Sequence, residues 1–147
     1  MPVRTNVTFD AISNTGKIEF FSGLAVVSSI EVFSTGMVTV SARPSAIVVP
    51  LMDFRQWIID CLNWMEDCER RLVVVRDGRA PYTIELKVVG LDHKLEGKIG
   101  INDYETVFHS ATNTVELAPR AAFSLTWREL VLFIKSYHVW TDHVILA

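Results

Sequence analysis

The amino-acid sequence predicts an α+β fold, in which two amphipathic helices at residues 53–69 and 126–138 lie against one face of a largely antiparallel β-structure. Three observations lead to this prediction. Apolar and polar residues alternate between turn signals over the first 50 positions, a segment with helical spacing follows, and alternation then returns before a second helical segment. We expect the strands to form either one large curved sheet or two packed sheets.

The composition fits a single domain spanning residues 1–147. Apolar residues make up 50% of the chain and charged residues 21%, so a core can form without disulfides or metal ions. The mean hydropathy of +0.28 is high, which is consistent with a partner covering part of the apolar surface. No apolar run approaches the roughly 18 residues that a membrane span needs, and the amino end lacks a secretory signal. We therefore expect a cytoplasmic protein that does not contact the membrane.

The first 50 residues are typical of an antiparallel meander. The segments VTFDAI, KIEFF, LAVVSSIEVF and MVTVSA have strand composition, and SNTG, Ser22-Gly23 and Ser34-Thr35-Gly36 separate them. A glycine that closes a three-residue loop suits the left-handed position of a bulged hairpin.

The segment DFRQWIIDCLNWMEDCER contains the clearest helical pattern in the chain. Asp53 and Gln56 have the spacing of a capping box. Its apolar residues gather on one side at 100° per residue, which predicts a buried face. Cys61 and Cys68 fall on that face, so we expect core thiols rather than a disulfide or a reactive nucleophile.

Strand patterns return in RLVVV and PYTIELKVV, which flank a predicted hairpin turn at Asp77-Gly78. HKLEGKIGIN, YETVFH and NTVELA continue the β-structure. A second helix is expected to begin at TWRE, because Thr126 and Glu129 have capping-box spacing.

The final segment, HVWTDHVILA, admits two interpretations. As a helix it places His138 and Asp142 one turn apart on one face with His143 beside them, which is a workable arrangement for metal ligands. As a strand it sends His143 to the opposite face. The β-branched and aromatic residues of the segment favour a terminal strand, so a metal site is the lesser hypothesis.

Two apolar residues occupy predicted solvent-facing positions of the helices. Leu132 falls among charged residues of the second helix, and Ile59 lies between Arg55 and Asn63 in projection. These positions predict a contact surface for another protein or a second copy of the chain, unless a segment of the same chain buries Leu132.

A basic cluster that includes Arg76 and Arg79 provides a second candidate contact region. Acidic residues interleave with it, and the chain has a net charge of −3 and a pI near 5.8, so binding to nucleic acid is not expected.

The sequence therefore predicts a non-catalytic protein-interaction domain, such as an inhibitor, an immunity-type protein or an adaptor. This prediction follows from the lack of nucleophile-elbow and phosphate-binding motifs, and no cofactor is expected. Two alternatives stay open. One is a small metal-binding protein or metal-dependent enzyme that uses His138, Asp142 and His143, and the other is a self-associating structural subunit.

Overall fold

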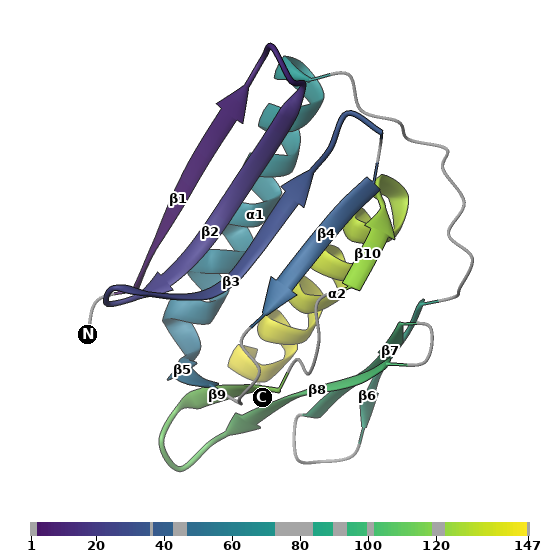
Figure 1. Ribbon diagram of the computed structural model, residues 1–147. Helices are drawn as coiled ribbons and strands as arrows, with labels where there is room; N and C mark the ends of the chain where they lie inside the picture. Colours follow the sequence, from purple (N-terminus) through teal and green to yellow (C-terminus); the bar gives the residue numbers. More distant parts are fainter. Residues whose placement is uncertain are drawn as a thin grey trace.

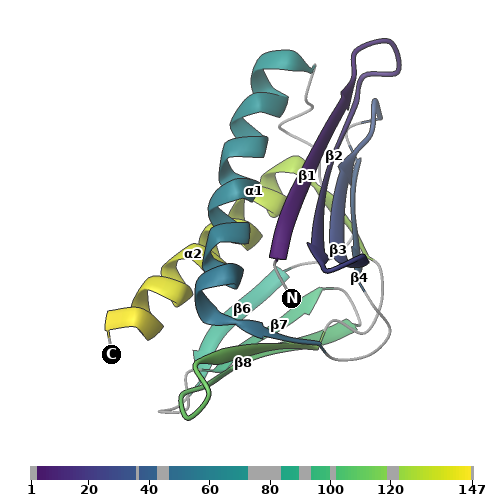
Figure 2. The same cartoon turned by 90° about the vertical axis from the view of Figure 1, so that its left-hand side faces the viewer.

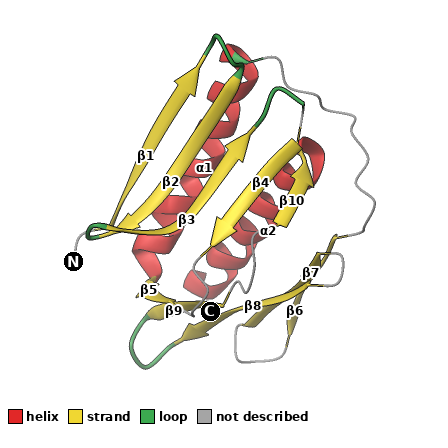
Figure 3. Cartoon of the chain, in the orientation of Figure 1, coloured by secondary structure: helices red, strands yellow, loops and turns green. Residues whose placement is uncertain are grey.

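The computed structural model describes residues 3–35, 37–42, 47–72, 84–89, 94–99, 102–118 and 123–146. These residues form two antiparallel sheets and two long helices (Figure 1, Figure 3), which confirms the α+β prediction and selects the two-sheet alternative. In chain order the elements are β1 (Val3–Asp10), β2 (Thr15–Ser22), β3 (Ala25–Val32), β4 (Met37–Ala42), β5 (Ile47–Pro50), α1 (Leu51–Arg71), β6 (Ile84–Val89), β7 (Lys94–Ile99), β8 (Asn102–His109), β9 (Thr114–Ala118), β10 (Phe123–Thr126) and α2 (Trp127–Leu146).

The two halves of the chain follow the same plan. Each half has a four-stranded meander, then a short fifth strand, and then a helix. The fifth strands are exchanged between the sheets. The order of the first sheet is β1-β2-β3-β4-β10, and that of the second sheet is β5-β9-β8-β7-β6. Each sheet therefore takes its outermost short strand from the other half of the chain.

The turns of the first meander need residues that tolerate positive φ. Gly23 has a φ of 64° between β2 and β3, which agrees with the glycine predicted there. In the preceding hairpin Asn14, with a φ of 55°, is the left-handed residue instead of Gly16. Gly16 lies inside β2, where it pairs with Phe9.

The two helices lie on the same side of the first sheet (Figure 2). Strands β6, β7 and β8 lie at the opposite end of the molecule from the carboxyl-terminal end of α1. One continuous core contains residues of both helices and of strands β2, β3, β4, β5 and β9. Phe54 of α1 is a central contact, because its ring packs against Trp57 and, across the helix pair, against Tyr137 and Trp140 of α2. The two helices therefore bury their aromatic faces against each other as well as against the strands.

The start of α1 corrects the predicted capping box. The helix begins at Leu51, after Pro50, and has no side-chain cap. Asp53 is thus inside the first turn, where a carboxylate interacts favourably with the helix dipole but does not cap. The backbone N–H of Leu51 instead donates to the carbonyl of Asn113, 3.1 Å away in the β8–β9 turn.

The start of α2 confirms the other capping box. Thr126 Oγ1 accepts a hydrogen bond from the N–H of Glu129, and Glu129 Oε1 accepts from the N–H of Thr126 at 3.0 Å. The backbone N–H groups of Thr126 and Glu129 therefore each donate to the side chain of the other residue, as the sequence spacing predicts.

We expect Thr126→Ala to lower the free energy of unfolding by about 1 kcal/mol, because the alanine cannot accept the hydrogen bond from Glu129. Urea denaturation followed by circular dichroism would measure this loss. The matched control is Asp53→Glu, which keeps the negative charge in the first turn of α1 and should change stability by less than about 0.5 kcal/mol. Equal losses in the two variants would contradict the assigned caps.

The prediction of a terminal strand is wrong, because α2 continues to Leu146. Four residues in this part of the helix are buried at helical spacing, namely Tyr137, Trp140, Thr141 and Val144. Burial of this face in the core outweighs the preference of β-branched residues for extended structure. No helix among the described residues is long and apolar enough to cross a membrane.

Candidate functional site

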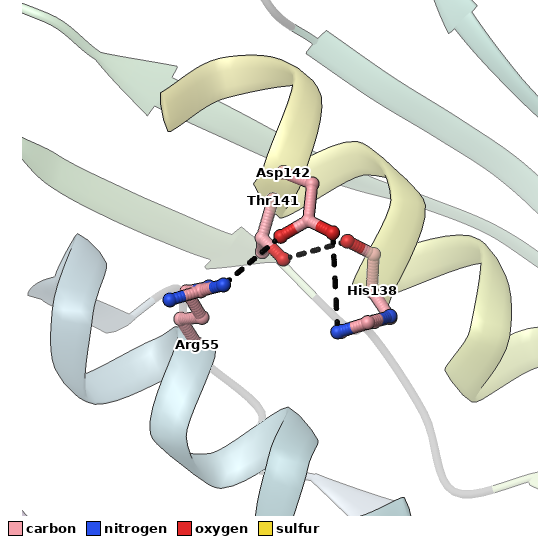
Figure 4. A network of polar contacts seen from close by, with 4 residues as sticks. All are labelled: Arg55, His138, Thr141 and Asp142. Carbon is pink, nitrogen blue, oxygen red and sulfur yellow. Dashed lines mark hydrogen bonds and ion pairs between the residues drawn. The ribbon is translucent and has the colours of Figure 1, made fainter. Parts of the chain in front are cut away.

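The extension of α2 brings His138 and Asp142 together on one helix face (Figure 4). His138 Nε2 lies 4.0 Å from Asp142 Oδ2. Arg55 of α1 donates from Nη2 to Asp142 Oδ1 at 3.2 Å, and Thr141 Oγ1 donates to the carbonyl oxygen of His138. Residues 87 positions apart thus form one half-buried network between the two helices.

The geometry of this network bears on the metal hypothesis in two opposite ways. The helix supplies the one-turn spacing of His138 and Asp142 that two metal ligands need. The guanidinium of Arg55, however, already neutralises the Asp142 carboxylate, and a bound cation would have to displace it. The side chain of His143 is outside the described part of the structure. Within that part, no group of three or more histidine, cysteine, aspartate or glutamate side chains is placed to hold a metal ion.

The two thiols lie in the core, as predicted. Both Cys61 and Cys68 are buried and reduced. Burial raises the pKa of Cys61 well above its ordinary value, and the Asp60 carboxylate adds to the shift. Burial, with a further contribution from Glu69, raises the pKa of Cys68 to about 12. Neither thiol is therefore a thiolate at neutral pH, which is the form that reacts with electrophiles or binds metals.

The predicted contact residues have different positions in the structure. Leu132 is 55% exposed on the outer side of α2, so its own chain does not bury it. Ile59 of α1 is only partly exposed. Arg76 and Arg79 lie outside the described residues. One further apolar residue on the outer side of α2, Val139 at 68% exposed, was not predicted as a contact, because its segment was expected to be a strand.

The two helices have the same burial pattern. Leu51 and Trp127, their first residues, differ by 76 in residue number. Each of the buried residues of α1 has a buried counterpart in α2 at this offset: Leu51 and Trp127, Phe54 and Leu130, Trp57 and Phe133, Ile58 and Ile134, Cys61 and Tyr137, Trp64 and Trp140, Met65 and Thr141, Cys68 and Val144. The helices therefore have matched inner faces, and their outer faces can be compared position by position.

The outer faces differ in polarity at two matched positions. Where the outer side of α2 has exposed apolar side chains, α1 has polar ones; the pairs are Leu132 and Gln56, and Val139 and Asn63. Polar residues at these positions of α1 are compatible with a folded helix. The apolar residues of α2 are thus not a requirement of this architecture, which makes its outer side the candidate functional surface.

The chain was compared with known proteins. No protein-family model matches it, and neither a curated protein nor a solved structure matches it.

Proposed function

We propose that this chain is a protein-binding module that acts by presenting a surface rather than by catalysis, and that the outer side of α2 is the contact surface. The observation that carries this proposal is the polarity difference at matched helix positions. Leu132 and Val139 are exposed on α2, whereas Gln56 and Asn63 occupy the same positions of α1.

The spacing of the exposed apolar residues supports this proposal. Leu132 and Val139 are seven residues apart, which places them on one side of a helix with two turns between them. Single exposed apolar residues are common on folded proteins, but two aligned on one side of a helix can contact the same partner. Burial of a leucine or valine side chain contributes roughly 1.5–3 kcal/mol, so two such residues can dominate the affinity of a small interface.

The direct test is affinity capture from an extract of the source cells, with Leu132→Asp and Val139→Asp compared with the unmodified chain. We expect each substitution to weaken capture of the partner at least about tenfold, because a hydrated carboxylate would replace an apolar contact. The matched controls are Gln56→Asp and Asn63→Asp, which put the same charge at the equivalent positions of α1 and should leave capture unchanged.

Circular dichroism of all four variants would establish that the fold is kept. If the two folded α2 variants capture the same protein as strongly as the unmodified chain, the proposed surface is wrong. If the α1 controls lose capture to the same degree, the effect is one of charge in general and the proposal also fails.

Self-association is the nearest alternative, because the same surface can bind a second copy of the chain. Light scattering over a concentration series distinguishes the two functions. A mass that rises with concentration in the unmodified chain, but not in Leu132→Asp, would identify the partner as a second copy.

The metal alternative has one observation in its favour, the one-turn spacing of His138 and Asp142 on α2. Elemental analysis of the purified protein, with His138→Ala as the control, tests it independently of any protein partner. Stoichiometric metal in the unmodified chain that is lost in the variant would support a metal site.

A further inference from the structure

We infer that the partner presents an amphipathic helix whose apolar side chains alternate with carboxylates, and that this helix docks along Arg128, Leu132, Lys135 and Val139 of α2. These four residues are called the α2 line below. The inference rests on the proposed function and adds to it the chemistry of the partner.

The α2 line has the geometry of a helix-packing seam. Its four residues follow one another at intervals of four, three and four positions, and all four are exposed. This spacing keeps side chains on one side of a helix. At a rise of about 1.5 Å per residue, the line is about 16 Å long, so three turns of a partner helix would cover it.

The charge of the α2 line is positive, although the whole chain has a net charge of −3. Neither Arg128 nor Lys135 has an ion-pair partner among the described residues. The acids of α2 are already engaged, because Glu129 accepts from Thr126 and Asp142 accepts from Arg55. A partner with carboxylates at matching positions would therefore complement the line, and the pairs would set its register.

The matched positions of α1 again provide a comparison. At the offset of 76 residues, the α2 line corresponds to Met52, Gln56, Ile59 and Asn63 in α1. None of these four side chains is charged. The alternation of basic and apolar residues is therefore a property of α2 alone and is not imposed by the repeated architecture.

The width of the line favours a helix over a lipid surface. The residues on the inner side of α2, from Trp127 to Val144, are buried in the core, so only one row of apolar residues is available. Helices that bind membrane surfaces expose a broad apolar face instead. A single row interdigitates well with the side chains of one partner helix.

The test uses the full chain and two synthetic helical peptides. Both peptides carry leucines seven residues apart, and the positions between them hold glutamate in one peptide and lysine in the other. Fluorescence anisotropy would give the dissociation constants. We expect the glutamate peptide to bind at least about tenfold more tightly than the lysine peptide, and to lose this advantage as salt is raised, because exposed ion pairs are screened.

Charge reversal on the protein provides the decisive comparison. In the double variant Arg128→Glu with Lys135→Glu, the preference should reverse in favour of the lysine peptide. Leu132→Asp should weaken both peptides, and Asn63→Asp should weaken neither. Circular dichroism of each variant keeps a folding defect from being mistaken for lost binding.

The following results would overturn the inference. Equal binding of the two peptides would remove the role of charge, and binding of neither at about 1 mM would exclude this class of helix. Tighter binding of the unmodified chain to phosphatidylserine vesicles than to either peptide would identify a membrane surface instead.

If Leu132→Asp abolishes capture from the extract but the charge reversal does not, this inference fails while the proposed function stands. If Leu132→Asp leaves capture intact, the proposed function itself fails.

Discussion

Replacing Trp140 with alanine should lower the free energy of unfolding by about 3–5 kcal/mol, and replacing Trp64 should lower it by a similar amount. The two tryptophans occupy matched positions of the two helices, and each is only 1% exposed. Trp140 packs against Phe54 and Tyr137, and Trp64 packs against Trp127. Truncation of either ring would leave a large cavity in a closely packed core. Urea denaturation followed by circular dichroism would measure both losses.

The control for this pair is Val139→Ala, which truncates the exposed neighbour of Trp140 and should change stability by less than about 0.5 kcal/mol. Neither indole N–H of the two tryptophans has a hydrogen-bond partner among the described residues, so truncation would remove packing and no such bond. A loss below about 1 kcal/mol for Trp140→Ala would mean that the end of α2 is not docked in the core.

Proline at position 139 should lower the free energy of unfolding by about 3 kcal/mol or more. Val139 is inside α2, where a proline removes the backbone N–H that bonds four residues back and its ring collides with the preceding turn. The side chain is 68% exposed, so the loss would come from the backbone and not from packing. Urea denaturation and helical ellipticity of Val139→Pro would measure the effect.

Val139→Ala is again the matched control, because alanine at the same position keeps the helix intact. Should proline and alanine at position 139 have the same small effect, the last turns of α2 would not be a helix that contributes to stability. The Val139→Pro result thus tests the main correction that the structure makes to the sequence prediction.

The main elements of the fold were predictable because their signals are local. The apolar residues of α1 recur at helical spacing over five turns, and the strands of the first meander alternate between clear turn residues. The capping boxes show the limit of this reasoning. Thr126 and Asp53 precede similar patterns, but only Thr126 caps, because α1 begins at Leu51, two residues before Asp53. A spacing rule cannot locate the first residue of a helix when the tertiary structure sets it.

The end of α2 was mispredicted because its composition and its burial favour different structures. Val139, Thr141 and Val144 favour a strand when considered alone. Their helical state depends on Trp140 reaching the core beside Phe54 of α1, a contact between distant parts of the sequence. The alignment of Trp64 with Trp140 at an offset of 76 residues was the signal in the sequence that could have identified this helix.

The candidate surface was predictable only in part. Leu132 stood out because its neighbours are charged, whereas Val139 could be placed on the same outer side only after the helix was extended. The ion pair between Arg55 and Asp142 joins residues 87 positions apart, so no local pattern contains it. The contacts of a site that combines two helices depend on how those helices pack.

The exchange of β5 and β10 between the two sheets has a consequence for biosynthesis. β4 is complete at residue 42, but its outer neighbour is β10, at residues 123–126. While a ribosome makes the intervening residues, the backbone N–H and carbonyl groups along that side of β4 have no strand to pair with. Unpaired strand edges promote aggregation during synthesis, and pairing between distant segments slows folding. The nascent first meander therefore has an unpaired edge until residue 126 has been made.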